Sequence, residues 1–311
     1  MNVMGANQFA ARVTGNFEIC RDHYRLVLSA ADFPQSRPGQ FIQIACRDPA
    51  MCDGEPQTDW SPGSQPDLCD PEFAKPVAVL RRPFSLAGRR GDQIDIIHRV
   101  VGIGTRFLST LQLGDEVSIL GPLGNVFTLP EPDQLAILVG GGVGIPPMIY
   151  LASELADHRA VALAGAVCRD LMPLTVGSAP YQVAEFSNFN IPAILSTDDG
   201  SLGFRGFVTQ ALEEFLDNRL APEIHRGGRP IIYTCGPEPM MKRVADIAVQ
   251  RNIPCQVAVE RAMACGMGTC QSCCIRVKKS DSAQPPLPGS DWCYRLTCTD
   301  GPIFTAAQLL W

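Results

Sequence analysis

Cysteines near the carboxyl end of this 311-residue sequence have the spacing of iron–sulfur ligands. The segment ERAMACGMGTCQSC contains Cys265, Cys270 and Cys273 as C-x4-C-x2-C, the plant-type [2Fe-2S] pattern, which needs a fourth thiolate further on. Cys298, in RLTCTDGPIF, is our choice for that fourth ligand. Cys293 also follows at a workable distance and remains an alternative, because the sequence alone does not define the intervening loop.

Four thiolates also suit a structural zinc ion, so the same cysteines have a second interpretation. Structural zinc sites usually pair their ligands as two CxxC units, and this segment contains only one, Cys270 to Cys273. We therefore favour the two-iron cluster, with Gly266 and Gly268 allowing a tight loop whose amides face the sulfurs. With zinc bound instead, the chain would be a non-enzymatic interaction module and the purified protein would be colourless.

A second motif, RRPFSLAG, brings an arginine, an aromatic ring and a hydroxyl together in one short strand. Arg82 can clamp a phosphate, Phe84 can pack on a flat ring, and Ser85 can bond the edge of an isoalloxazine, which we expect on one side of the strand. Downstream, VVGIGTRFL opens a helix whose amides and dipole favour a diphosphate. The residues expected to hold FAD are Arg82, Pro83, Phe84, Ser85, Gly104 and Thr105.

Glycine turns after two apolar strands predict a nucleotide site. In LAILVGGGVGIPPM a strand leads through glycines to a helix start, which lets a pyrophosphate approach the backbone. In YTCGPEPMM a second strand ends at Cys235, whose thiol can approach a nicotinamide and is our candidate catalytic group. Asp198, in TDDGSLG, can bond a ribose or cap a turn. The expected nucleotide-binding residues are Gly141, Gly142, Gly144, Asp198, Cys235 and Gly236.

The elements that position these motifs change character near Pro130. Before it, β-rich runs at 24–30, 41–46, 93–101 and 116–120 and one helix near 105–113 predict a small antiparallel barrel. After it, helices alternate with strands expected at 135–139, 160–167, 194–197, 231–235 and 255–259, which predicts a doubly wound parallel sheet. The expected fold is mixed β and α/β: a FAD-binding β-barrel domain at 1–131, an NAD-binding α/β domain at 132–256 and a small [2Fe-2S] cluster domain at 257–311.

Composition and charge narrow the function classes. The net charge is −6 without any Lys/Arg block, so the chain lacks the basic surface that binds nucleic acid. The most apolar stretch, 135–151, is interrupted by glycines and prolines, so we expect no membrane span. The first residues lack a signal-peptide pattern, and 13 cysteines in such a chain indicate metal or redox chemistry in the cytoplasm. A proline-rich loop, 47–76, carries Cys52 and Cys69, which we interpret as incidental thiols.

Taken in order, RRPFSL, GIGT, GGGVGIPP, TDDGS, TCGPEPMM and the cysteine segment resemble the ferredoxin reductase superfamily. The cysteine segment with TDGPIF looks like that of the electron-transfer subunit of class 1B dihydroorotate dehydrogenase. The resemblance implies FAD, a [2Fe-2S] cluster and NAD as cofactors, held by the residues named above. It also implies a partner, an FMN-containing catalytic subunit that oxidises dihydroorotate to orotate in pyrimidine biosynthesis, and assembly as a heterotetramer.

Two other functions stay open beside this resemblance. A reductase subunit of a sulfur, sulfite or hydrogenase complex would share the flavin and nucleotide motifs and serve a different partner. The zinc-stabilised interaction module is the other. The preference for NAD over NADP also comes from the family, because Arg169 could attract a 2′-phosphate while the adjacent Asp170 would repel it.

Overall fold

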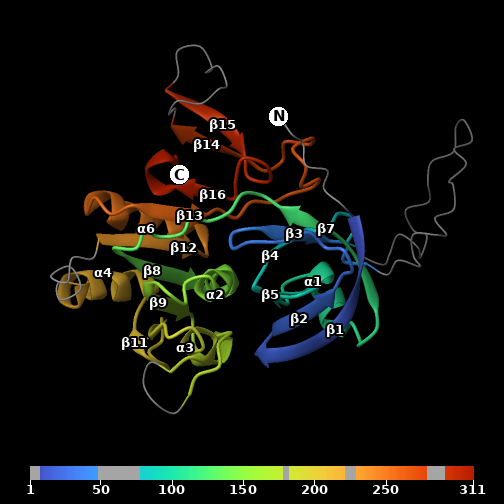
Figure 1. Cartoon of the computed structure of the whole chain (residues 1–311), viewed down its shortest axis with the longest axis horizontal. Helices are drawn as coiled ribbons and strands as arrows, with labels where there is room; N and C mark the ends of the chain where they lie inside the picture. Colours follow the sequence, from blue (N-terminus) through green and yellow to red (C-terminus); the bar gives the residue numbers. More distant parts are fainter. Residues whose placement is uncertain (1–7, 48–77, 178–181, 221–228, 279–290) are drawn as a thin grey trace, which may run out of the picture.

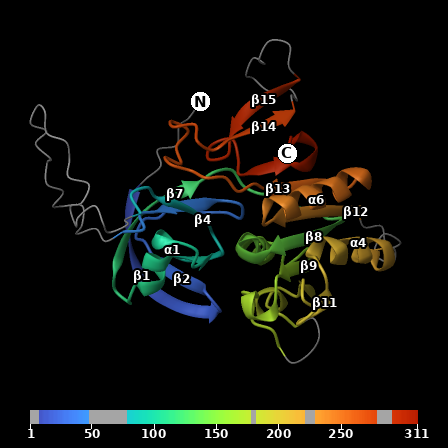
Figure 2. The same cartoon turned by 180° about the vertical axis from the view of Figure 1, so that it is seen from behind.

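The computed structural model describes residues 8–47, 78–177, 182–220, 229–278 and 291–311. An N-terminal β lobe and a C-terminal α/β lobe lie side by side, and a small hairpin from the last part of the chain lies above the α/β lobe (Figure 1). Figure 2 shows the same arrangement from behind. The expected mixed β and α/β fold is confirmed.

The N-terminal lobe is one seven-stranded antiparallel sheet in the order β4-β3-β7-β1-β2-β6-β5. Its strands are β1 (Gln8–Cys20), β2 (His23–Ser29), β3 (Phe41–Ile44), β4 (Arg82–Ser85), β5 (Gly88–Arg90), β6 (Gln93–Arg99) and β7 (Glu116–Leu123). The edge strands β4 and β5 are joined by only Leu86 and Ala87, so the sheet curls round on itself. Leu86 and Ala87 donate backbone hydrogen bonds to Gln40 and Asp95, which holds the two edges together as in a barrel.

Most of this lobe matches the predicted segments. Strands β2, β3, β6 and β7 correspond to the four predicted runs, three of which were predicted one or two residues too long at their ends. Strand β1 was not predicted, because only Ala11 and Val13 of its 13 residues are buried and the apolar alternation is weak. The expected helix is α1 (Ile103–Thr110), and it begins two residues early because the Thr105 hydroxyl accepts the amides of Val101 and Gly102 at 2.9 and 3.2 Å.

The C-terminal lobe contains a second seven-stranded sheet, in the order β11-β10-β9-β8-β12-β13-β16. Its strands are β8 (Gln134–Gly141), β9 (Arg159–Ala166), β10 (Ala193–Thr197), β11 (Phe204–Arg205), β12 (Arg229–Cys235), β13 (Cys255–Ala258) and β16 (Ile303–Thr305). Neighbouring strands run parallel, except that β16 is antiparallel to β13. The five strands predicted for this lobe are all present, so the parallel sheet is confirmed.

Helices cover both faces of this sheet, as the doubly wound prediction requires (Figure 1). They are α2 (Ile145–Ser153), α3 (Ala184–Ser187), α4 (Val208–Asn218) and α6 (Glu238–Gln250). Successive residues of β8 point to opposite faces: Val139 packs with Leu212 of α4 and Val244 of α6, whereas Leu138 packs with Met148 of α2. The strand order reverses between β8 and β12, so the loops that follow these two strands meet where such sheets bind ligands.

The last part of the chain contributes to two sheets. Strands β14 (Cys274–Lys278) and β15 (Trp292–Leu296) form an antiparallel hairpin, and β16 then joins the edge of the α/β sheet. The division proposed at residue 256 falls within β13 and stays a proposal. Residues 48–76 of the proline-rich loop, with Cys52 and Cys69, lie outside the described residues. No helix in the described ranges is long and apolar enough to cross a membrane.

Candidate functional site

The cysteine segment and the chain around Cys298 meet beside the barrel. The loop that carries Cys265, Cys270 and Cys273 follows β13, and Cys298 lies in the turn between β15 and β16. Cys273 and Cys298 are buried in one apolar cluster with Phe41 of β3 and side chains of β7. Thr297 ties the two segments together, because its amide and hydroxyl both donate to the Cys273 carbonyl, at 3.1 and 2.9 Å.

The four sulfurs are arranged as two pairs. The side chains of Cys265 and Cys270 are within hydrogen-bonding distance of each other, and so are those of Cys273 and Cys298. The Cys265 sulfur also accepts the backbone amides of Cys270 and Met267, each at 3.4 Å. Within the described residues, no three cysteine, histidine, aspartate or glutamate side chains converge on a single ion. A [2Fe-2S] cluster takes two cysteines on each iron, whereas a structural zinc takes four on one ion, so paired sulfurs fit the cluster better.

The environments of the sulfurs differ between the pairs. Hydrogen bonds with Ser272 lower the pKa of the exposed Cys270 thiol to about 6, which favours the thiolate that binds metal. Burial raises the pKa of Cys298 to about 12, and the backbone amide of Gly268 acts against that rise. Gly268 and Gly266 have φ of +82° and +71°, so the loop adopts the left-handed turns expected of these glycines and aims amides at the sulfurs.

The alternative fourth ligand lies elsewhere. Cys293 is in β15 and packs in the core of the α/β lobe with Ile275, Val277 and Leu309. Its side chain therefore belongs to a different apolar cluster from those of Cys273 and Cys298. This separation supports Cys298 as the fourth ligand, which stays a proposal.

The flavin motif lines a cavity of about 690 Å³ at the edge of the barrel. One wall is Arg82, Pro83 and Phe84 of β4, and another is the start of α1 with Gly104 and Thr105. Within the described residues, the side-chain hydrogen bonds of Arg82 go only to the carbonyls of Leu80 and Arg81, so most of its five donors remain for a phosphate. The donor set and the aromatic side chain fit a flavin nucleotide.

Contrary to the expectation, the side chain of Ser85 does not share one side of the strand with those of Arg82 and Phe84. Side chains alternate along a strand, so Ser85 of β4 points away from the face that carries the other two, and it is not among the cavity-lining residues. The cavity instead includes Glu238 from α6 and the segment 260–262, which the sequence did not identify. The contact of Ser85 with a flavin edge remains a prediction.

A second cavity, of about 740 Å³, lies across the carboxyl ends of the parallel strands. Gly141 and Gly142 line it at the end of β8, Asp198 at the end of β10, and Pro237 after β12. Gly144 lies behind this edge and supports it, because α2 begins there and packs directly on the end of β12. The structure thus brings the glycine loop, the TDDGS turn and the TCGPEP turn together, where amides at a helix start can bind a pyrophosphate.

Cys235, the candidate catalytic residue, is buried in the apolar core below this edge. Burial raises the pKa of its thiol to about 12, with Glu260 adding to the rise, so the side chain stays a neutral thiol. Cys235 is not among the residues that line either cavity. Its role at a nicotinamide remains a prediction, and the raised pKa restricts it to contact rather than nucleophilic attack.

The two aspartates of TDDGS have different positions. Asp199 accepts the amide and hydroxyl of Ser201, at 2.9 and 2.6 Å, and so caps the turn. Asp198 lines the cavity, and burial, with the charge of Asp199, raises the pKa of its carboxyl. Asp198 is therefore the aspartate that can contact a ribose, whereas Asp199 caps the turn.

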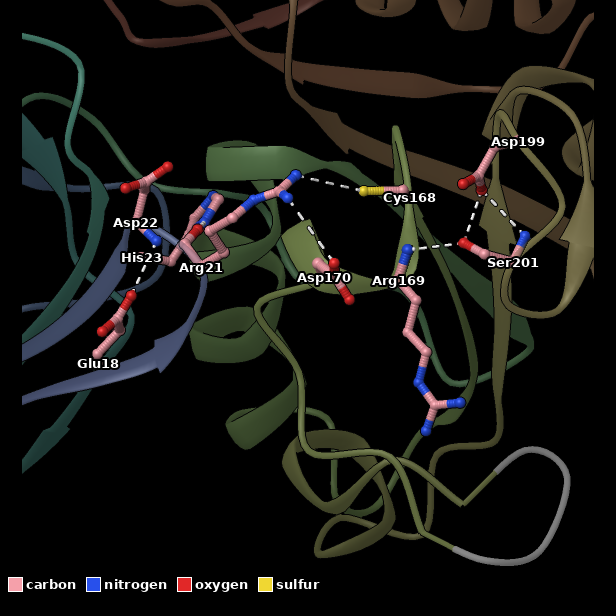
Figure 3. A network of polar contacts seen from close by, with 9 residues as sticks. All are labelled: Glu18, Arg21, Asp22, His23, Cys168, Arg169, Asp170, Asp199 and Ser201. Carbon is pink, nitrogen blue, oxygen red and sulfur yellow. Dashed lines mark hydrogen bonds and ion pairs between the residues drawn. The ribbon is translucent and has the colours of Figure 1, made fainter.

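The barrel also contributes to the nucleotide cavity, which sequence reasoning missed. His23 and Arg99, a register pair of β2 and β6, line its near side. Figure 3 shows a contact between the two lobes next to His23: the Arg21 side chain reaches Asp170 at 3.7 Å and the Cys168 sulfur at 3.8 Å. No local motif marks these residues, because they become neighbours of the nucleotide loops only when the two lobes pack.

The side chain of Arg169, which could attract a 2′-phosphate, lies away from the TDDGS turn. Its amide donates to Ser201 at 2.8 Å, but Figure 3 shows its guanidinium turned away from Asp199 and Ser201. Arg169 is not among the residues that line the nucleotide cavity. An attraction of Arg169 for a 2′-phosphate therefore has no support in this geometry.

Comparison with known proteins gives consistent results. Residues 260–310 match the family model described as the iron-sulfur cluster binding domain of dihydroorotate dehydrogenase B. A structure of an NADH-dependent reduced ferredoxin-NADP oxidoreductase, studied for flavin-based electron bifurcation, is similar with a TM-score of 0.70 and 25% identity, covering 99% of this chain and 92% of that one. A cytochrome P450 reductase of Amycolatopsis, at TM-score 0.55 and 23% identity over 79% of this chain and 67% of its own, shares the fold.

Two curated relatives extend the match over nearly the full length. The dihydroorotate dehydrogenase B (NAD(+)) electron transfer subunit of Desulforamulus reducens is 28% identical, covering 97% of this chain and 98% of its own. The protein of the same name from Geobacillus thermodenitrificans is 32% identical over 92% of both chains. With the paired cysteines, the flavin cavity and the nucleotide loops in one chain, this identity shows that the protein belongs to the family of dihydroorotate dehydrogenase B electron transfer subunits.

Proposed function

We propose that this chain is the electron-transfer subunit of an NAD-dependent dihydroorotate dehydrogenase, with FAD, a [2Fe-2S] cluster and NAD as its cofactors. The family and the ferredoxin reductase-like fold support electron transfer as its activity. The catalytic partner is then a separate FMN-containing subunit that oxidises dihydroorotate to orotate, and the assembly a heterotetramer. The electron-transfer subunit gives the complex access to NAD⁺.

One observation supports this proposal more than any other. Glu260, Arg261 and Ala262 line the flavin cavity, and the same segment leads within three residues to Cys265, the first proposed cluster ligand. Arg261 also bonds Glu238, the first residue of α6, at 2.5 Å. The proposed flavin, nucleotide and cluster sites therefore share neighbouring backbone, which is the arrangement that short-range electron transfer requires.

The residues of the chain would bind the flavin and the nucleotide and orient them. Arg82 would hold a flavin phosphate, the amides of Gly104 and Thr105 at the start of α1 would take the diphosphate, and Phe84 would pack against the ring. Gly141 and Gly142 would admit the nucleotide pyrophosphate, with Asp198 at the ribose. No side chain needs to act as acid or base, because placement is the main task of the protein.

When bound, the flavin supplies the exchange between the single electrons of an iron–sulfur cluster and the hydride of a nicotinamide. The four cysteines, as two pairs, would hold the two irons, and the amides at Cys265 and Cys298 would stabilise added charge on sulfur. Because Cys273 and Cys298 are buried among apolar side chains, water is excluded from that side of the site.

The cytoplasmic location is part of the same proposal. All described cysteines are free thiols, which persist where cellular thiol systems keep them reduced. A cytoplasmic partner that makes orotate for pyrimidine biosynthesis would be found in the same compartment.

The proposal is tested by reconstitution with a purified FMN-containing dihydroorotate dehydrogenase subunit from the same source. We expect dihydroorotate-dependent reduction of NAD⁺ only when both proteins are present, and co-elution on size-exclusion chromatography. The matched control is the Cys298→Ser chain, which should retain FAD and lose the coupled reaction. Oxidation of dihydroorotate without NADH formation in the wild-type mixture would contradict the proposal.

A further inference from the structure

A buried glutamine of the barrel faces the cluster loop without a partner. Gln43 of β3 is 0% exposed, and neither its side-chain nitrogen nor its oxygen has a hydrogen-bond partner within the described residues. Buried amides are almost always hydrogen-bonded, because the loss of water has to be compensated. An orphaned amide at this position therefore indicates an acceptor that the chain itself does not supply.

The amide end of Gln43 lies against the turn that follows Cys265. A β-carbon on Gly266 would be 2.8 Å from both Cδ and Nε2 of Gln43, so the end of the Gln43 side chain lies directly against this turn. The other neighbours of this turn are apolar, among them Leu123 of β7 and the buried Phe41. The Gln43 amide thus faces the loop of the proposed cluster site and is surrounded by apolar side chains.

Gln43 also lies next to the flavin strand. In the register of β3 and β4 it is opposite Pro83, whose neighbours Arg82 and Phe84 line the flavin cavity. Its side chain therefore lies on the face of the sheet that carries Pro83, opposite to the face of Arg82 and Phe84, and meets the cluster loop at Gly266.

We propose that the Gln43 side-chain amide donates a hydrogen bond to a sulfur of the [2Fe-2S] cluster and raises its reduction potential. Cluster sulfurs are acceptors only, so they satisfy Nε2 and hold the amide in one orientation. Reduction adds negative charge to the sulfurs, and a donor stabilises that charge in a low-dielectric environment. The inference rests on the proposed cluster site and adds a potential-setting residue from the flavin lobe.

The test is Gln43→Met in the full, cofactor-loaded chain, because Met has a similar shape and no donor. We expect unchanged iron and flavin content and a lower cluster midpoint potential in an EPR-monitored redox titration. Gln43→Leu provides a second variant should the Met chain fold poorly, with the same expected direction.

The matched control is Gln40→Met. The Gln40 amide is satisfied within the chain, donating to the Gly124 carbonyl at 3.2 Å and accepting the Arg37 amide at 2.9 Å. Loss of the Gln40 amide should lower the thermal stability of the chain and leave the midpoint potential of the cluster unchanged. A Gln43→Met potential equal to that of the wild type, with or without a gain in stability, would overturn the inference. Absence of iron from the wild-type chain would instead reject the proposed function.

Discussion

Gly144 lies so close to the Cys235 carbonyl that a β-carbon at position 144 would be 2.2 Å from the Cys235 oxygen. The nucleotide loop after β8 therefore packs backbone to backbone on the end of β12. Because the clash would be with backbone, Gly144→Ala should separate the two strand ends. We expect a loss of about 1–3 kcal/mol in stability and roughly tenfold weaker NADH binding, measured by denaturation and by fluorescence titration.

Gly142→Ala is the matched control in the same loop. A β-carbon at Gly142 would meet no other atom of the chain within 4 Å, so within the fold itself the φ of +53° is what opposes the substitution. We expect a cost of about 1–2 kcal/mol with little change in the packing of α2. Equal NADH affinity in the Gly144→Ala and wild-type proteins would contradict the close-approach argument.

The separation of Cys298 from Cys293 predicts opposite outcomes for two similar substitutions. Cys298→Ser should reduce the iron content from about two atoms per chain to near zero, because one iron loses a ligand of its pair. Cys293→Ser removes a thiol from the core of the α/β lobe and should lower stability by about 1 kcal/mol while iron stays bound. Metal analysis and visible absorption of anaerobically purified protein give the answer. Loss of iron only in the Cys293 variant would reverse the assignment.

His98 should make the barrel sensitive to acid. The ring is 2% exposed, stacks on Tyr24 and meets the edge of Phe84, and burial lowers its pKa from 6.5 to about 4. In the unfolded chain His98 is protonated below pH 6.5, whereas in the folded chain it is protonated only below about pH 4. The contribution of neutral His98 to the free energy of unfolding is thus fully present above pH 6.5. It falls by about 3 kcal/mol as the pH drops from 6.5 to 4.

His98→Phe tests this by removing the titrating ring and keeping a flat one. Between pH 7 and 5.5 the denaturation midpoint of the variant should fall less than that of the wild type. Some slope remains, since burial also lowers the pKa of His23. Identical pH profiles for the two proteins would show that His98 is not the acid-sensitive group.

The ion pair of Arg261 and Glu238 at the flavin cavity predicts shifts of opposite sign. Glu238→Gln leaves the Arg261 cation unpaired and should raise the flavin midpoint potential, whereas Arg261→Gln leaves the carboxylate and should lower it. Each shift should be roughly 20 mV, equivalent to about 1 kcal/mol at a partly exposed site. The double variant should return towards the wild-type potential. A spectroelectrochemical titration measures all three.

The control for this pair is on the same helix. Lys242 and Asp246 form an exposed ion pair of 2.9 Å in α6 that does not line the flavin cavity. Lys242→Gln should leave the flavin potential unchanged. Shifts in the same direction for Glu238→Gln and Arg261→Gln would indicate a structural disturbance instead of an electrostatic effect.

Local patterns predicted the parallel sheet and the cysteine segment well. Apolar runs such as Leu135–Val139, followed by glycines and a helix, predict a buried strand and its turn from the sequence alone, because backbone freedom and burial act locally there. The spacing of Cys265, Cys270 and Cys273 likewise determines which sulfurs share one loop. These features depend on neighbours in the chain.

Contacts between lobes could not be predicted in the same way. His23 and Arg99 reach the nucleotide cavity only in the packed arrangement of the two lobes, where Arg21 contacts Cys168 and Asp170, and none of these residues belongs to a motif. The hairpin of β14 and β15 was missed because each strand has one exposed face and only short runs of apolar residues. The face of Ser85 could have been predicted, because alternation along a strand puts it opposite to Arg82 and Phe84 wherever β4 begins.

The most direct measurement of the central claim is the addition of NADH to the isolated chain under anaerobic conditions. The account predicts about two irons and one FAD per chain, bleaching of the flavin, and the EPR signal of one reduced two-iron centre. A protein that contains zinc and no iron, or an iron centre that NADH cannot reduce through the bound flavin, would contradict it.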